Sequence, residues 1–129
     1  MNYTVGDFLI RVKNAYMASR TDLTVPHAKT VKAVADILKR ENYIKDIKEI
    51  EVDGKKVLEI KLDYSNREPS MLDVKIISKP SLRIYVRKNE VKTLLRELGT
   101  HVLSTNQGVL TANDAVKKGV GGELICHVV

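Results

Sequence analysis

Apolar residues recur every three or four positions near the start of the chain, and this spacing predicts two amphipathic helices. The first begins near residue 4, and its apolar stripe consists of Val5, Phe8, Leu9, Val12 and Tyr16. The second covers about 28–41, and its stripe consists of Val31, Val34, Ala35 and Leu38. The other faces are polar, so each helix is expected to bury one side against a core.

After Tyr43 the period changes from helical to alternating, which is typical of β-strands. Asp53-Gly54 interrupts the alternation and favours a two-residue hairpin turn. Such a turn has a positive φ at both central positions, and aspartate followed by glycine is a preferred pair there. Residues 57–64 are the expected return strand. Residues 1–64 are therefore predicted to form a module of two helices packed on a small β-sheet. The polar segment 65–70, which contains a proline, is the predicted linker.

Residues 71–129 are predicted to form a second, mostly antiparallel β module with one short helix. Strands are expected over 71–77, after Pro80 and over 123–129, and a hairpin is expected around the polar loop 104–108. A single helical turn is expected between Thr111 and Gly119. Helices followed by strands make the predicted fold class α+β.

The short helix of this second module is expected to begin at Asn89, a good capping residue, and to end at Gly99. Its apolar residues are expected to face inward; they are Val91, Leu94, Leu95 and Leu98.

Charge then indicates a partner. The chain has 22 Lys and Arg against 16 Asp and Glu, a formal net charge of +6 and a pI of about 9.4. Residues 75–96 hold seven of the cations and one anion, Glu90. Such a balance favours contact with nucleic acid or another anionic surface, although a basic cluster is often only a solvated face.

Two segments could bind RNA. If 79–87 is an extended strand, alternation places Lys79, Ser81, Arg83, Tyr85 and Arg87 on one face. That face would offer cations for phosphates and a ring for base stacking, or it is simply the wet face of a sheet. The loop formed by Ser104, Thr105, Asn106, Gln107 and Gly108 carries hydroxyls and amides that could read RNA, or it is an ordinary hairpin loop.

Catalytic chemistry finds little support. Cys126 and His127 would point to opposite faces of a strand, and no Cys or His pair has zinc-ligand spacing. Glu123 and His127 could share a strand face, where an exposed pair is expected. The glycines of 119–122 lead into a strand and not into a helix, so they predict a turn and no nucleotide cradle. We predict no catalytic residue, no metal ligand and no cofactor.

One cysteine, and no stretch near the roughly 20 apolar residues of a membrane span, lead us to expect a cytoplasmic protein without a membrane segment.

The chain resembles, along essentially its whole length, the bacterial family of small-subunit ribosomal protein eight. The motifs that carry this resemblance are residues 7–15 (DFLIRVKNA), 26–29 (PHAK), 37–44 (ILKRENYI), 78–85 (SKPSLRIY), 98–111 (LGTHVLSTNQGVLT) and 119–126 (GVGGELIC). The resemblance implies two small modules. It also implies a primary rRNA binder that docks on the central domain of small-subunit rRNA, helps assembly beside neighbouring proteins and, in some bacteria, represses its own operon mRNA.

By the same resemblance, Ser104, Thr105 and Asn106 correspond to the loop that meets RNA. Tyr85 and Glu123 match further contact positions, and Lys29 and Lys32 match a basic edge of the amino-terminal module. The chain departs from the usual family residues at four positions, which are Ser81 (glycine), Asn106 (serine), Gln107 (lysine) and His127 (tyrosine). Gln107 removes one expected phosphate contact.

We therefore expect a non-catalytic structural protein of the small ribosomal subunit, monomeric when free, without cofactor. Two alternatives remain at this point. A DNA-binding regulator would need a recognition helix for the major groove, and a small enzyme acting on anionic substrates would need a reactive group such as Cys126.

Overall fold

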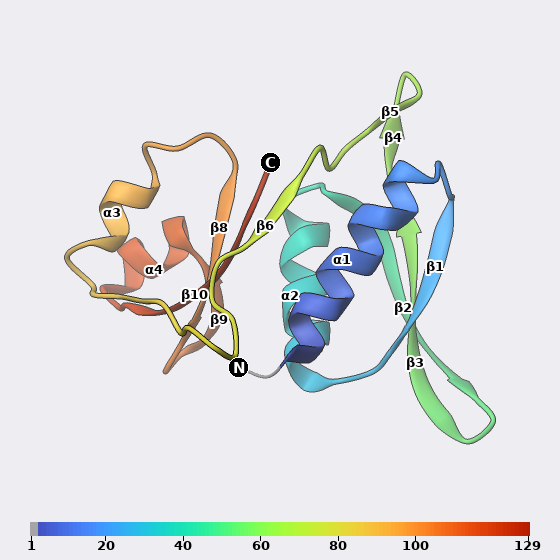
Figure 1. The fold of residues 1–129 in the computed structure, drawn as a ribbon, viewed down its shortest axis with the longest axis horizontal. Coiled ribbons are helices and arrows are strands. Elements are labelled where there is room, and N and C mark those ends of the chain that lie inside the picture. The colour runs from blue at the N-terminus through green and yellow to red at the C-terminus, as the bar shows by residue number, and fades with distance from the viewer. Residues whose placement is uncertain (1–2) are drawn as a thin grey trace.

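The computed structural model describes residues 3–129, and the first half of the chain folds as the periodicity predicts (Figure 1). Helix α1 covers Tyr3–Met17 and α2 covers Lys29–Arg40. Strands β1 (Asp22–Pro26), β2 (Ile44–Val52) and β3 (Lys55–Leu62) form an antiparallel sheet in the order β1-β3-β2. The two apolar helix stripes are buried as predicted.

The β2–β3 connection confirms the predicted hairpin. Asp53 and Gly54 have φ values of 52° and 77°, the left-handed pair that matches the twist of two antiparallel strands. Strand β1 was not expected. Its alternation of Leu23 and Val25, both buried, is only five residues long and ends in a proline, so its signal is weak.

The predicted linker forms a tight hairpin of its own. Strand β4 (Tyr64–Ser65) pairs with β5 (Glu68–Pro69) through Asn66 and Arg67, both at positive φ. The division into modules at 65–70 stays a prediction, because buried side chains from both sides of this hairpin belong to one hydrophobic cluster.

The second half is built around strand β10 (Gly122–Val128). Its sheet has the order β6-β10-β8-β9, with β6 at Val74–Ile76, β8 at Thr100–Thr105 and β9 at Gly108–Thr111. Strand β7 (Tyr85–Val86) also pairs with β10. Helix α4 (Ala112–Lys118) begins where Thr111 accepts a hydrogen bond from the Asp114 N–H, and it ends at Gly119, with φ 66°.

Two expectations for this half are wrong. The strand over 79–87 is reduced to β7, because Lys79 and Leu82 pair in a tight turn that leaves Leu82 exposed. Helix α3 covers only Val91–Leu94, and Glu90, rather than Asn89, is its N-cap residue. Leu95 and Leu98 are exposed rather than buried, because the helix stops before it can turn them inward.

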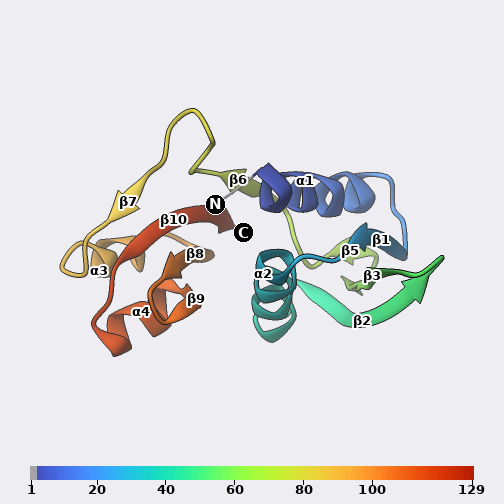
Figure 2. The ribbon, with the colours of Figure 1, turned by 90° about the horizontal axis from the view of Figure 1, so that it is seen from below.

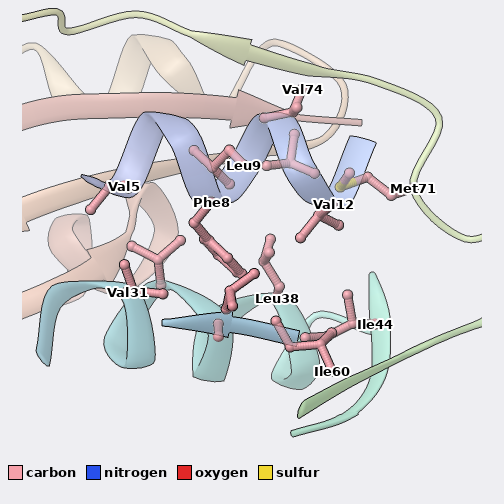
Figure 3. Packing of buried hydrophobic residues seen from close by; sticks show 14 of the residues in the cluster. Val5, Phe8, Leu9, Val12, Val31, Leu38, Ile44, Ile60, Met71 and Val74 are labelled. Carbon is pink, nitrogen blue, oxygen red and sulfur yellow. The ribbon is translucent and has the colours of Figure 1, made fainter. Parts of the chain in front are cut away.

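One hydrophobic cluster joins the halves. Side chains of α1 and α2, among them Phe8 and Leu38, pack with Met71 and Val74 from beyond the β4–β5 hairpin (Figure 3). Figure 2 shows α1 and α2 on the side of the sheet β1-β3-β2 that faces the second half of the chain. A second, smaller cluster lies under α3 and α4.

Polar contacts cross the same boundary. The Tyr43 hydroxyl lies 3.1 Å from Thr100 Oγ1 and donates to the Val128 carbonyl at 3.2 Å, and Arg40 pairs with Asp114 at 2.8 Å. The two halves are therefore packed directly against each other. None of the helices within residues 3–129 has the length and apolar character to cross a bilayer.

Candidate nucleic-acid interface

The predicted RNA-binding residues of the second half meet in a row across three strands. Glu123 of β10 is paired with Tyr85 of β7 on one side and with Ser104 of β8 on the other. Residues directly opposite each other in a sheet point to the same face. The loop residues Asn106 and Gln107 form the β8–β9 turn at the end of this row. Tyr85 and the 104–108 loop, distant in sequence, therefore lie on one surface, which we call the β10 face.

A shallow depression lies in the β10 face. It is lined by residues 119–122 and by Tyr85, Lys88, Ser104, Thr105, Asn106 and Glu123. Two glycines make it possible, since a Cβ on Gly121 would lie 2.3 Å from the Val86 carbonyl oxygen. A Cβ on Gly122 would lie 2.2 Å from the Ser104 carbonyl oxygen. Only Gly119 of this run needs left-handed torsions, so the run serves close strand approach as well as a turn.

The turn that closes the row is shaped by Thr105. Its hydroxyl donates to the Gly108 carbonyl at 2.7 Å and accepts from the Gln107 N–H at 3.1 Å. Gly108 itself has a φ of 101°, which L side chains rarely adopt. Thr105 and Gly108 therefore hold the turn in shape, while the Asn106 and Gln107 side chains are exposed.

Several polar side chains of this face have no hydrogen-bond partner among the described residues. Within residues 3–129, no hydrogen bond is made by the side chains of Tyr85, Ser104, Asn106 or Gln107. Tyr85 is 70% exposed, an unusual state for an aromatic ring, so much of it is accessible to a stacking partner. These groups can therefore donate to or accept from a ligand without breaking an internal bond.

Glu123 differs from expectation because it is buried rather than exposed. Ser78 donates to its Oε2 at 2.5 Å and Arg83 at 3.2 Å. Burial raises the pKa of Glu123, but hydrogen bonds, including those from Ser78 and Arg83, outweigh burial and leave the pKa below its ordinary value. Since Ser78 also accepts from the Ile84 N–H, this carboxylate anchors the chain that leads to Tyr85.

The predicted cations fall into two groups. Arg83 is already paired with Glu123, and Lys32 is paired with Asp36 at 2.8 Å. In contrast, Arg87, Lys88 and Lys29 are exposed, and their side chains form no ion pair within residues 3–129. In Figure 1 the first turn of α2, which holds Lys29, and the β8–β9 turn both lie toward the lower edge of the molecule.

Sequence reasoning missed two contributors to this site. Lys88 lines the depression because the Gly121 backbone brings it close, and Ser78 reaches Glu123 across 45 positions of chain. The only sequence signal for either was the glycine run, whose small size permits backbone approach.

Sequence reasoning also missed a histidine pair. The rings of His101 and His127 are stacked, with centroids 4.1 Å apart and an interplanar angle of 8°, beside Glu97. Burial and the nearby His127 lower the pKa of His101, and Glu97 raises it by less. These three residues are the group in the described chain that could hold a metal ion.

The reactive-thiol alternative fails on the structure. Cys126 is completely buried, and burial raises the pKa of its thiol to about 12. A nucleophilic cysteine needs a thiolate near neutral pH and access to substrate. For the DNA-regulator alternative, α3 has only four residues and is too short to serve as a recognition helix.

A comparison with protein families decides the identity. A family model described as Ribosomal protein S8 matches residues 3–129. The chain belongs to the ribosomal protein S8 family. This confirms the resemblance, and with it the prediction of a structural, non-enzymatic ribosomal protein that serves translation and, in bacteria, is cytoplasmic.

Individual relatives agree over their full lengths. The chain is 42% identical to the small ribosomal subunit protein uS8 of Heliobacterium modesticaldum, over 99% of this chain and 98% of that protein. It is 43% identical to the small ribosomal subunit protein uS8 of Geobacillus stearothermophilus, over 100% and 98% respectively. The corresponding protein of Enterococcus faecalis is 42% identical over 99% and 98%.

Proposed function

We propose that this ribosomal protein binds directly to the central domain of small-subunit rRNA through the β10 face and thereby helps assembly of the small subunit. The names of the relatives place those proteins in the small subunit. The observation that carries the proposal is that strand register brings Tyr85 and Ser104 together on either side of Glu123, beside the β8–β9 turn. Within residues 3–129, the side chains of Tyr85, Ser104, Asn106 and Gln107 make no hydrogen bond, so they are available to a ligand.

The β10 face combines two kinds of recognition. The exposed cations Arg87 and Lys88, which form no ion pair within residues 3–129, can neutralise phosphates. This gives affinity through counterion release but little sequence selectivity. Selectivity comes from the Ser104 hydroxyl and the Asn106 and Gln107 amides, which can read the edges of unpaired bases and 2′-hydroxyls. Stacking of a base on Tyr85 adds to both the affinity and the selectivity.

Glu123 and Arg83 have a different role in this proposal. Their ion pair, together with Ser78, holds β10 and the approach to Tyr85 in place, so they position the contact residues from within. Lys29, at the start of α2, is free to make a second, weaker phosphate contact, while Lys32 is partly neutralised by Asp36.

The test compares RNA fragments. We expect the chain to bind a central-domain fragment of small-subunit rRNA more tightly than an rRNA fragment of equal length from another domain or duplex DNA. The affinity should fall steadily as salt rises, because cations of the β10 face displace counterions. Equal binding to all three nucleic acids, or binding that ignores salt, would contradict the proposal.

Two finer expectations belong to the same proposal. An operon mRNA that folds like the rRNA site would be bound by the same face, so the two RNAs should compete for one protein. An operon mRNA that binds without displacing the rRNA fragment would separate the two activities.

The free chain should sediment as a monomer, and in the particle it should have neighbouring small-subunit proteins as further partners.

A further inference from the structure

Three potential metal ligands meet beside the carboxyl-terminal end of β10, outside the row that forms the β10 face. His127 of β10 is paired with His101 of β8, so both rings project from the same side of the sheet. Glu97, from the loop between α3 and β8, places one carboxylate oxygen 3.6 Å from His101 Nε2 and 3.8 Å from His127 Nδ1. The three ligand atoms all lie within 4.8 Å of one another.

The hydrogen bond made by the His127 ring leaves its other nitrogen directed toward Glu97. His127 Nε2 lies 2.6 Å from the Leu98 carbonyl oxygen, which can only accept, so Nε2 carries the ring proton in the neutral form. Nδ1 of His127 then carries the lone pair, and it is this atom that faces Glu97. A backbone carbonyl that fixes the tautomer is the outer-shell arrangement typical of metal-binding histidines.

The loop that supplies Glu97 is held close to β10 by its own backbone. Gly99 has a φ of 96°, and a Cβ there would lie 2.3 Å from the Val128 carbonyl oxygen. In Figure 1 this loop reaches the end of β8 beside the carboxyl terminus. Glu97 is therefore brought to the histidines by the chain path, although its side chain is 59% exposed.

We propose that Glu97, His101 and His127 form a binding site for a divalent transition-metal ion, for which Zn²⁺ is the best match, with water as the fourth ligand. Two imidazole nitrogens and one carboxylate oxygen are a donor set that zinc accepts in open, four-coordinate sites. Imidazole donors disfavour Mg²⁺ and Ca²⁺, which prefer oxygen ligands.

Binding requires a local movement. Ligand atoms about 2.0–2.1 Å from a tetrahedral zinc ion lie about 3.3 Å apart, so the present separations must contract. Each ring's lone pair lies in the plane of that ring, so one ion cannot be held by both nitrogens while the rings stay parallel. The rings must therefore leave their stack as the ion enters, and the exposed Glu97 can follow it.

Neighbouring charges oppose the ion only weakly. Lys75 is paired with His127 across β6 and β10, and Lys75 and Lys79 both line the cavity that also contains Glu97 and the two histidines. Both lysines are exposed, so their ammonium groups can extend into water away from the ion. A bound ion would tie the α3–β8 loop to β10 and stabilise this end of the sheet.

The test uses the full chain without RNA, titrated with zinc chloride and, separately, with cobalt chloride. We expect one equivalent of Zn²⁺ to raise the thermal midpoint and to move the NMR ring signals of His101 and His127, while Co²⁺ gives the visible absorption of a tetrahedral site. Glu97→Gln and His127→Gln should each weaken binding by at least about tenfold, which is the usual cost of losing even an outer-shell partner.

His27 provides the matched control, because it lies 3.4 Å from Glu49 but belongs to no three-ligand group in the described chain. His27→Gln should leave zinc binding unchanged. The proposal is overturned if the two His ring signals do not respond to Zn²⁺, or if Glu97→Gln and His127→Gln both bind as tightly as the parent chain. Loss of binding in His27→Gln alone would also overturn it.

Discussion

In the amino-terminal half, every residue of the two apolar helix stripes is buried, whereas residues 71–98 leave four leucines and a tyrosine exposed. These five residues are Leu72, Leu82, Tyr85, Leu95 and Leu98. The first region consists of long helices and a paired hairpin, and the second contains only the short elements β6, β7 and α3. Regular structure, more than apolar composition, therefore decides which side chains of this protein are buried in the core.

Short elements have a physical reason to expose apolar residues. A four-residue helix such as α3 makes barely one turn, so it can direct Val91 inward but not Leu95 or Leu98. The segment around β7 is instead held by backbone contact with Gly121 and Gly122 and by the buried Glu123. That anchoring leaves Tyr85 outward, on the β10 face.

The largest expected difference between the regions comes from truncating one buried and one exposed side chain. Phe8→Ala should lower the free energy of unfolding by about 3–5 kcal/mol, because it removes a fully buried ring from the shared cluster. Leu98→Ala should change it by less than about 0.5 kcal/mol, since Leu98 is 83% exposed. Urea unfolding followed by circular dichroism measures both, and equal effects would remove the contrast.

Two glycines sharpen the comparison at the level of the backbone. Gly122→Ala should destabilise the chain by about 1–3 kcal/mol, because its Cβ would overlap the Ser104 carbonyl oxygen. Gly6→Ala lies in helix α1, where the nearest atom, of Ile76, is 3.6 Å away, so it should stabilise by about 0.5–1 kcal/mol. Thermal unfolding of the two variants should therefore shift in opposite directions. A stabilised Gly122→Ala would show that β8 does not need so close an approach.

The hydroxyls of the β8–β9 turn test the β10 face directly. The double variant Ser104→Ala with Thr105→Ala should weaken binding to the central-domain rRNA fragment by about 1–3 kcal/mol, because RNA loses the Ser104 hydroxyl and the turn loses the hydrogen bonds by which Thr105 shapes it. Thr24→Ala with Thr30→Ala, two exposed threonines of the first half, is the matched control and should bind normally. Filter binding at fixed salt measures both, and unchanged affinity of the first variant would show that RNA binds elsewhere.

The smallest expected effect is the contribution of Glu123 to acid stability. Its pKa is lowered in the folded chain, so its stabilising contribution is complete above the ordinary value of 4.5 and is lost as pH falls through the lowered value. In Glu123→Gln, the free energy of unfolding should therefore decrease less steeply as the pH falls below 4.5. Unfolding midpoints measured across the acid range test this, and parallel curves for the two chains would contradict it.

The sequence alone predicted the long elements well. The stripes of α1 and α2 are present, because each extends over several turns. The Asp53–Gly54 turn and the ends of α4 at Thr111 and Gly119 were predicted from residue types that favour those backbone positions, and strand β10 from its apolar run. Strand β1 and the true length of α3 were missed, because five and four residues carry too little periodicity.

For the candidate site, the sequence determined the chemical inventory: a basic segment, one tyrosine, a polar loop and a glycine run. Only the tertiary structure decided which of these meet, since Glu123 pairs with Tyr85 and Ser104 through strand register, and register is set by contacts distant along the chain. It likewise decided that Glu123 is buried on Ser78 and that Glu97, His101 and His127 converge. Periodicity reports which face a residue occupies on its own element, but not which element comes to lie against that face.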